Sequence, residues 1–331
     1  MNGARTNIDI SIIIPVYKVE RYIERCVRCL MEQTKKDGIE FLFVNDCTPD
    51  ASMEIIDSVL KEYPHRAEQV RIINNNDNKG VSATRKIGLS EAQGAYIGWC
   101  DADDCCEKDM FQQMWSKTEG GKIDMVICNY SEDDDLNSTA VKWNHCEHPR
   151  DCFINMREGF YFPGSLWQQI CRKEIIAKSL NLIVNVNYAE DIYSIILETF
   201  FAESIAYTDT VLYHHTSDNL SSLLHNVGYK KSDWNAQKAN LDLVSNYCTS
   251  SGNEKCITAC NALKLSMKHK FRSAFSSTYD FYCEYSDCYR DINNIYHTSQ
   301  RSRWKTFMIF NFYPLFWLFS RNNSGNKMNI I

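Results

Sequence analysis

The chain of 331 residues contains little glycine and proline, with 13 and 6 residues respectively. Disordered linkers are usually rich in these residues, so their scarcity argues against long linkers and indicates a folded chain. The length allows two domains, or one domain with a large extension. Hydrophobic residues make up 44% of the chain, which is enough for a substantial core.

The sequence also lacks an apolar run long enough to cross a bilayer. The longest run, Phe307–Phe319, would extend roughly 20 Å as a helix, whereas the hydrocarbon core is about 30 Å thick. The first seven residues, MNGARTN, are polar and contain no visible export signal. These features predict a cytoplasmic protein.

The 15 cysteines show no spacing typical of a small disulfide scaffold, and their number is odd. We therefore expect free thiols in a reducing compartment. The pair Cys26 and Cys29 has the CxxC spacing, but Cys26 belongs to the apolar face of an expected helix, which favours buried thiols over zinc. A second candidate for a structural metal, with irregular spacing, consists of His145, Cys146, His148 and Cys152.

A net charge of −6 argues against general nucleic-acid binding, which needs concentrated Lys and Arg. The charge is unevenly distributed. Residues 261–331 contain ten Lys and Arg against four Asp and Glu, a surplus of +6, which leaves −12 on residues 1–260. The basic surplus therefore lies at the C-terminal end.

Strand and helix patterns alternate over the first 110 residues. Strands are expected at 10–15, 40–45, 70–74 and 95–100, and helices at 19–30, 52–63 and 82–92. This βαβαβαβ order predicts an α/β fold with a mostly parallel sheet and a crevice beyond the carboxyl ends of the strands. Further along, we expect helices at 108–118 and 191–201, strands at 125–130 and 205–213, and mainly helices from about residue 229.

Acids follow two of these strands. Asp101 and Asp103 come directly after the fourth strand, where two carboxylates could hold one hard cation such as Mg²⁺ or Mn²⁺ together with a diphosphate. The alternative is a solvated acidic turn. Asp46 follows the second strand and could accept an N–H from a nucleotide base, or could cap a turn.

Four ordered segments resemble the motifs of family 2 glycosyltransferases, which have the GT-A fold. They are SIIIPVYKVERYIERCVRCLMEQT, FLFVNDCTPDASMEI, NDNKGVSATRKIGLSEAQGAYIGWCDADD and NYAEDIYSIILETFFAESIAYTDTVLYHH. The similarity covers about residues 8–215. It implies a nucleotide-sugar donor, with UDP as the expected nucleotide, a divalent cation and transfer with inversion at the anomeric carbon.

On the donor side, the resemblance implies that Pro15, Tyr17 and Asp46 frame the nucleoside, with Asp46 reading the base. Many relatives have Val-Asp-Asp-Gly where this chain has Val-Asn-Asp-Cys, so Asn45 is neutral and only Asp46 can supply a carboxylate.

The resemblance further implies that Arg85 supports the nucleotide, although Lys86 replaces the usual Asn after it. Asp101 would lie near the ribose and the metal, and Asp103 would be the principal metal ligand.

On the acceptor side, Glu190 and Asp191 resemble the family's Glu-Asp pair, and Asp191 matches the position of the general base. The alternative is an acidic helix start that complements the helix dipole. His214 or His215 could be a third metal ligand, although both could equally be ordinary strand residues. Trp167 resembles a segment near the acceptor, or is a core residue.

We expect a GT-A domain at residues 1–220 and a helical region at 221–331. Cations at 301, 303 and 305 lie beside an aromatic, apolar run that extends to residue 319. This composition of 301–321 suits an anionic membrane surface, or else packing on the protein or in a homo-oligomer. With a membrane contact, the acceptor would be a lipid-linked saccharide in cell-surface polysaccharide synthesis.

A different class of function is a non-catalytic nucleotide-sugar-binding or scaffold protein, against which the retained acids Asp46, Asp101, Asp103 and Asp191 argue. A dehydrogenase is disfavoured because no GxGxxG follows the first strand.

Overall fold

The computed structural model describes residues 8–132, 140–141, 145–155, 164–186, 188–216 and 230–288. The chain divides into two compact units, residues 1–155 with 160–228, and residues 156–159 with 229–331. The assignment of catalysis to residues 1–220 and of a helical extension to 221–331 stays a prediction.

A mixed sheet forms the centre of the first unit. Its strands lie in the order β3–β2–β1–β4–β8–β6–β9–β5, and β7 pairs with β6. The strands are β1 (Ile10–Val16), β2 (Ile39–Asn45), β3 (Val70–Asn74), β4 (Tyr96–Trp99), β5 (Cys105–Cys106), β6 (Met125–Glu132), β7 (Ala140–Val141), β8 (Gln169–Arg172) and β9 (Ile205–His215). As the sequence predicts, β1 to β4 are parallel.

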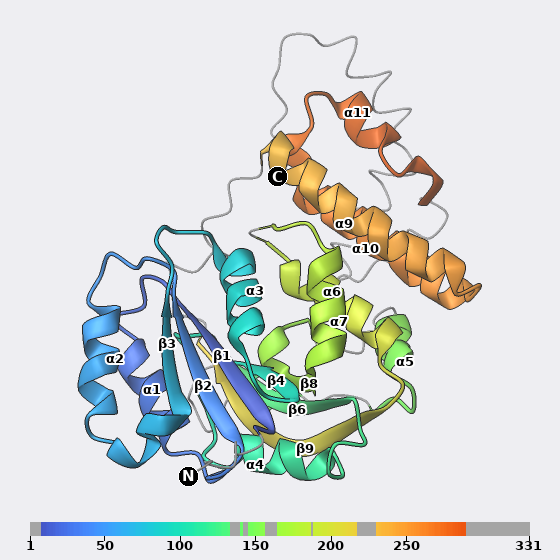
Figure 1. Cartoon of the computed structure of the whole chain (residues 1–331). Coiled ribbons are helices and arrows are strands. Elements are labelled where there is room, and N and C mark those ends of the chain that lie inside the picture. Colours follow the sequence, from blue (N-terminus) through green and yellow to red (C-terminus); the bar gives the residue numbers. More distant parts are fainter. Residues whose placement is uncertain are drawn as a thin grey trace. The chain divides into compact units, whose positions relative to one another are not determined.

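Helices cover both faces of this sheet (Figure 1). They are α1 (Ile23–Met31), α2 (Ser52–Leu60), α3 (Val81–Glu91), α4 (Met110–Lys117), α5 (Pro149–Asn155), α6 (Lys173–Leu182) and α7 (Glu190–Phe201), with the 3-10 turns η1 (Pro64–Gln69) and η3 (Leu166–Gln168). In Figure 1, α1 and α2 lie on one side of β1–β3, and α3 lies on the other side with α6 and α7. Gly88 lets α3 approach β1 closely, because a Cβ there would overlap Ile13 Cγ2.

The sequence analysis did not predict β8, which pairs antiparallel with both β4 and β6. Ile170 lies opposite Gly98 on one side and Val126 on the other. The strand is four residues long and buried in the sheet, and its sequence QICR has no apolar periodicity. It places η3 beside the end of β4, where the acids of the fourth strand begin.

The strand expected at 205–213 is longer in the structure and runs to His215. His214 and His215 are therefore strand residues, and their side chains point to opposite faces of the sheet.

The second unit is helical, as expected. Its described elements are α9 (Lys231–Ser250), α10 (Glu254–Lys270), η4 (Arg272–Ala274) and α11 (Thr278–Cys283). Asn253 caps α10, since its side chain accepts hydrogen bonds from the amides of Lys255 and Cys256. In the described part of the chain, no helix combines the length and apolarity needed to cross a membrane. The proposed membrane segment at 301–321 lies outside the described residues.

Lys268 of α10 is a buried cation in this unit, with 0% of its surface exposed. Its Nζ donates a hydrogen bond to the Glu284 carbonyl at 2.6 Å and lies 4.9 Å from the centre of the Phe281 ring. Burial lowers the pKa of Lys268 to about 7, although Glu284 acts in the opposite direction. The unfolded chain therefore binds more protons than the folded chain between pH 7 and 10.5, so this lysine costs stability at neutral pH.

We expect Lys268→Met to be more stable than the natural chain at pH 7, and to lose about 2 kcal/mol of this advantage between pH 7 and 9. Urea unfolding at several pH values measures the difference. Lys255→Met, at an exposed position of the same helix, is the control and should show a flat difference. An equally flat difference for Lys268→Met would contradict the prediction.

Candidate active site

The end of β1 supplies an exposed aromatic ring. Pro15 lies in the strand opposite Val44, and Tyr17 follows it with 40% of its surface exposed. Lys18 Nζ lies 5.2 Å from the centre of the Tyr17 ring. Tyr17 can therefore present a ring face to a ligand, as the predicted nucleoside site requires.

Asp46 follows β2 and is 3% exposed. Its Oδ1 accepts hydrogen bonds from the Lys79 amide and from Asn75 Nδ2, and its Oδ2 accepts one from the Gly80 amide, each at 2.9 Å. The carboxylate thus ties the end of β2 to the loop that leads into α3. The structure thus shows Asp46 in contact with this loop. That Asp46 reads a base stays a prediction.

Three non-glycine residues beside the candidate site residues have a left-handed backbone. Lys18, Cys47 and Ala189 have φ values of 55°, 56° and 61°, and they adjoin Tyr17, Asp46 and Glu190 respectively. Such residues cost about 1 to 3 kcal/mol each and are concentrated at functional sites. Cys47 occupies the position where the sequence motif of many relatives has glycine.

We expect Cys47→Gly to raise the free energy of unfolding by about 1 kcal/mol, because glycine adopts a positive φ without a Cβ clash. Urea denaturation measures the change. Cys47→Ala keeps the Cβ and is the matched control, which should leave the strain in place. The prediction is wrong if glycine is no more stable than alanine at this position.

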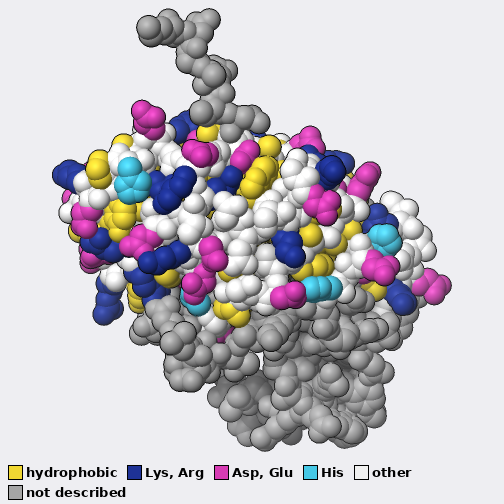
Figure 2. Space-filling model, turned by 90° about the horizontal axis from the view of Figure 1, so that it is seen from below, with side chains coloured by type: hydrophobic (Ala, Val, Ile, Leu, Met, Phe, Trp, Pro, Cys, Tyr) yellow, Lys and Arg dark blue, Asp and Glu magenta, His cyan; other side chains and the backbone are white. Residues whose placement is uncertain are grey.

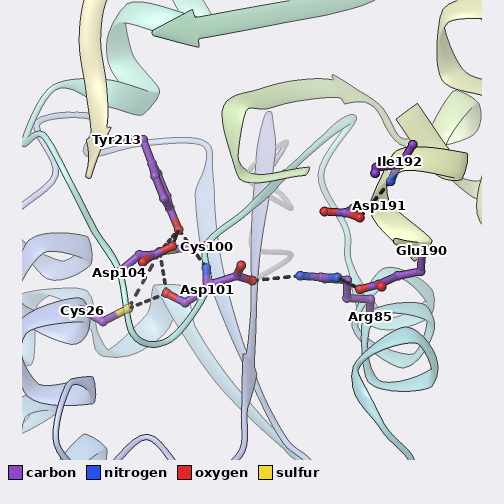
Figure 3. Close-up of polar contacts among 9 residues, drawn as sticks. All are labelled: Cys26, Arg85, Cys100, Asp101, Asp104, Glu190, Asp191, Ile192 and Tyr213. Atoms are coloured by element: carbon purple, nitrogen blue, oxygen red, sulfur yellow. Dashed lines mark hydrogen bonds and ion pairs between the residues drawn. The ribbon is translucent and has the colours of Figure 1, made fainter. Parts of the chain in front are cut away.

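Arg85 of α3 connects two distant acids (Figure 3). It is 6% exposed, its Nη2 donates to Asp101 Oδ1 at 2.9 Å, and its Nη1 donates to Glu190 Oε1. Burial would lower the pKa of Arg85, but Asp101, Glu190 and Asp191 more than offset this and raise it. Arg85 is therefore a fixed cation between the end of β4 and the first turn of α7.

Asp191, the predicted general base, is half-buried in the first turn of α7. Its Oδ1 accepts a hydrogen bond from the Ile192 amide at 2.9 Å. Burial, and then the charge of Glu190, raise the pKa of Asp191 to about 7, while Arg85 opposes this shift. Figure 3 shows the carboxylate pointing away from α7, toward the side where Arg85 and Asp101 lie. A carboxylate with this pKa suits general base catalysis near neutral pH.

The loop after β4 contains a third acid that the sequence analysis did not single out. Asp104 is buried and accepts hydrogen bonds from the Tyr213 hydroxyl and the Thr216 amide, both at 2.7 Å. Burial and the neighbouring Asp103 and Asp101 raise its pKa well above the usual range. The signal available in the sequence was the run of acids itself, but nothing in it distinguishes Asp104 from Asp103.

Asp103, the predicted principal metal ligand, lies between Asp101 and Asp104 in the sequence and is half-buried. Its carbonyl oxygen accepts hydrogen bonds from Arg25 Nη2 at 3.2 Å and from Thr216 Oγ1 at 2.8 Å. These contacts fix the backbone of residues 101–104, which we call the acidic loop, against α1 and the end of β9.

The two histidines differ in their surroundings. Both ring nitrogens of His214 are engaged, Nδ1 with Ser131 Oγ at 2.7 Å and Nε2 with Glu107 Oε1 at 2.8 Å. His215 Nδ1 contacts Glu132 Oε2 at 3.0 Å. Burial lowers the pKa of His215, but Asp104 and Glu132 outweigh it, so the pKa is raised. The acidic loop therefore acts on the pKa of His215.

Trp167 packs within a group of rings instead of lying open to a ligand. Its ring stacks on Tyr213 with 4.3 Å between centroids and on His215 with 5.7 Å, and Tyr130 meets it edge-on at 4.9 Å. This buried stack supports the strand ends that carry the acidic loop.

All 15 cysteines are free thiols. The Sγ atoms of Cys26 and Cys100 lie 3.8 Å apart, and so do those of Cys29 and Cys106. The CxxC pair of α1 therefore packs through its sulfur atoms on residues that flank the acidic loop. In the second candidate cluster, Cys152 contacts the Tyr207 hydroxyl and His145 stacks on its ring. Across the described residues, no three His, Cys, Asp or Glu side chains are arranged to hold a metal ion.

Residues 11–169 match the sequence model of the family described as Glycosyl transferase family 2. The chain carries a family 2 glycosyltransferase domain. The Bacillus subtilis (strain 168) protein EpsH is 32% identical over 222 residues, which are 65% of this chain and 62% of EpsH. The minor teichoic acid biosynthesis protein GgaB of the same organism is 33% identical over 115 residues, 34% of this chain and 12% of GgaB. The chain therefore spans less than two thirds of the length of either relative.

The fold of the family 2 domain also matches a solved structure. The crystal structure of S. aureus TarS 1-349 in complex with UDP-GlcNAc superposes with a TM-score of 0.66 and 14% identity, and covers 87% of this chain and 82% of that one. The likeness confirms the expected GT-A fold, a mostly parallel sheet with flanking helices followed by a helical region.

Proposed function

We propose that the protein is a metal-dependent inverting glycosyltransferase that moves a sugar from a nucleotide-sugar, with UDP as the nucleotide, to a saccharide or lipid-linked saccharide acceptor. The observation that carries this proposal is Asp191, a half-buried carboxyl whose pKa is raised to about 7 beside Arg85 and Asp101. The family 2 domain supports the reaction class, and the TarS complex with UDP-GlcNAc supports the choice of nucleotide.

In this reaction the Asp191 carboxylate accepts the proton of the acceptor hydroxyl. The hydroxyl oxygen forms a bond to the anomeric carbon as the bond from that carbon to the diphosphate oxygen breaks. The electron pair leaves with the nucleoside diphosphate, and the single displacement inverts the configuration. A carboxylate with a pKa near 7 is ionised enough to take the proton and basic enough to hold it.

Pro15, Tyr17 and Asp46 frame the nucleoside in this proposal, at the ends of β1 and β2. The exposed ring of Tyr17 supports a stacking contact with the base. The hydrogen bonds from the Lys79 and Gly80 amides to Asp46 support a nucleoside site whose loop is already ordered before the ligand binds. In the proposal, Arg85 lies beside the nucleotide and supports it.

A divalent cation, Mn²⁺ or Mg²⁺, fits the donor set of the acidic loop. Asp101 and Asp103 offer half-buried carboxylates, the hard oxygen ligands that these ions prefer, whereas both carboxylate oxygens of Asp104 accept hydrogen bonds within the protein. A diphosphate would be repelled by these acids without an added positive charge. Asp103 and Asp101 would hold the ion, and His215 would be the third ligand rather than His214, because both ring nitrogens of His214 already have partners within the protein. When bound, the ion neutralises the leaving diphosphate as a Lewis acid.

The proposed acceptor and location are supported by a relative and by the C-terminal composition. The printed description of GgaB as a teichoic acid biosynthesis protein supports a cell-surface polymer, and the cations and rings of 301–321 support contact with the inner face of the membrane. Flotation of the full chain with anionic liposomes at low salt tests this contact, which is excluded if the protein stays with the soluble fraction.

A panel of nucleotide-sugars with Mn²⁺ or Mg²⁺ tests the proposed function most directly. Binding is measured by calorimetry, and slow hydrolysis of the donor by release of the nucleoside diphosphate. We expect one UDP-sugar to bind and to be hydrolysed. Binding without any turnover, even with saccharide acceptors added, would favour the scaffold function, and an absence of binding across the panel would contradict both.

A further inference from the structure

The carboxylates of the acidic loop already have partners within the protein. Asp101 Oδ1 accepts a hydrogen bond from Arg85, and Asp104 accepts hydrogen bonds from Tyr213 and Thr216. The Asp101 side chain is nevertheless 32% exposed, so it can be approached from solvent. A cation that reaches Asp101 alone therefore meets a carboxylate that is already paired with the guanidinium of Arg85.

Arg85 cannot easily move away from Asp101. Its second arm donates to Glu190 of α7, and its guanidinium carbon lies 6.0 Å from the centre of the Trp99 ring. Its Nε is buried and has no hydrogen-bond partner among the described residues. The guanidinium is thus held in place by contacts on both arms.

We propose that Arg85 is the resident counter-ion of Asp101 and excludes a free divalent cation, so that the cation enters the site only together with the donor diphosphate. This proposal rests on the proposed function, and it adds an order of binding to it. The physical reason is that a fixed positive charge repels a dication within a few ångströms, whereas a diphosphate brings enough negative charge to overcome the repulsion.

The test measures binding of Mn²⁺ alone to the full chain, by the electron paramagnetic resonance signal of the free ion. Arg85→Gln by itself would leave Glu190 buried without its partner and could fail to fold. The informative comparison is therefore between the double variant Arg85→Gln/Glu190→Gln and the single variant Glu190→Gln, which differ only in the arginine.

We expect the double variant to bind Mn²⁺ about tenfold more tightly than Glu190→Gln, or more, because one nearby positive charge is removed. Adding Asp101→Asn to the double variant should reverse this gain. Equal affinities of the double and single variants, with both folded by circular dichroism, would overturn the proposal. So would tight Mn²⁺ binding by the natural chain without nucleotide.

A second arm separates this proposal from the proposed function. UDP should tighten Mn²⁺ binding by the natural chain by about tenfold or more, since the two ligands share one site. If UDP does not bind at all, the proposed function fails, whereas the comparison of the two variants with Mn²⁺ alone still decides whether Arg85 excludes the free cation. If UDP binds without tightening Mn²⁺ binding, the joint entry of cation and diphosphate is wrong.

Discussion

Asp191→Asn is expected to lower kcat by about a thousandfold, because general base catalysis contributes about 10² to 10⁴ to the rate and the amide cannot accept the proton. Binding of the donor should change by less than about threefold, since the proposed function places Asp191 on the acceptor side of the site. Single-turnover kinetics measures the first quantity and calorimetry with UDP the second. Full activity in this variant would remove Asp191 from the mechanism.

Glu198→Gln is the matched control for this substitution. Glu198 is a buried acid two turns further along α7, and it accepts hydrogen bonds from Ser194, Ser179 and Gln169. Its neutral amide analogue should keep the activity within about threefold. A comparable loss in both variants would mean that α7 is damaged generally.

The dependence on pH follows from the same carboxyl. Because Asp191 must be ionised to act, the transfer rate of the natural protein should rise with pH and level off above about pH 7, where the pKa of Asp191 lies. This rise is the acidic limb of the pH profile. The groups that face Asp191 are Glu190, Arg85, Asp101 and Tyr188. The residual activity of Asp191→Asn should lack this limb.

Stability should change in the opposite direction to activity. The folded pKa of Asp191 is raised above 3.8, so the folded chain binds more protons than the unfolded chain between pH 3.8 and 7. The stability contributed by the protonated carboxyl is therefore lost as the pH rises through 7. At pH 8 the Asn variant should melt at a higher temperature than the natural protein, and a lower melting temperature would contradict this reasoning.

Removal of divalent cations is expected to reduce transfer by about a hundredfold or more, because the leaving diphosphate loses its neutralising charge. Dialysis against a chelator, followed by addition of Mn²⁺ or Mg²⁺, measures the loss and its recovery. Asp103→Asn should reproduce the loss at ordinary cation concentrations, and a large excess of Mn²⁺ should restore part of the activity.

Glu107→Gln is the control for the acidic loop, since it lies just beyond it and contacts His214 without belonging to the proposed site. It should bind UDP with Mn²⁺ as the natural protein does. Unchanged activity after exhaustive removal of cations would exclude the metal from the reaction.

Much of the first unit could be predicted from the sequence because β1, β2 and β4 are almost entirely buried, whereas β3 is only partly buried. The run Val70–Asn74 was predicted with the observed bounds, and the other three early strands within one residue at either end. Parallel strands buried on both faces leave continuous β-branched runs, which are a strong local signal. The strands β5, β7 and β8 were missed, since strands of two to four residues are too short to show a periodicity. The helices α5 and α6 were missed as well.

The candidate site was less accessible to prediction. The acids at the strand ends could be found from local order along the chain, but the partners of these acids could not. Arg85 and Glu190 are separated by 105 positions, and only packing of α3 beside α7 brings them together. The electrostatic surroundings of the site are also invisible in a net charge, and Figure 2 shows acidic and basic side chains interspersed over one face of the molecule.

The position of Arg85 has a consequence for engineering. Exchange of α7 and its flanking loops for those of a relative, in order to change the acceptor, would also replace a partner of a residue in the donor half. A chimera that brings a neutral residue to position 190 would leave a buried guanidinium with one acid instead of two. Under the proposed function, donor and acceptor preferences are therefore not separable modules in this domain, and productive chimeras should carry positions 85 and 190 together.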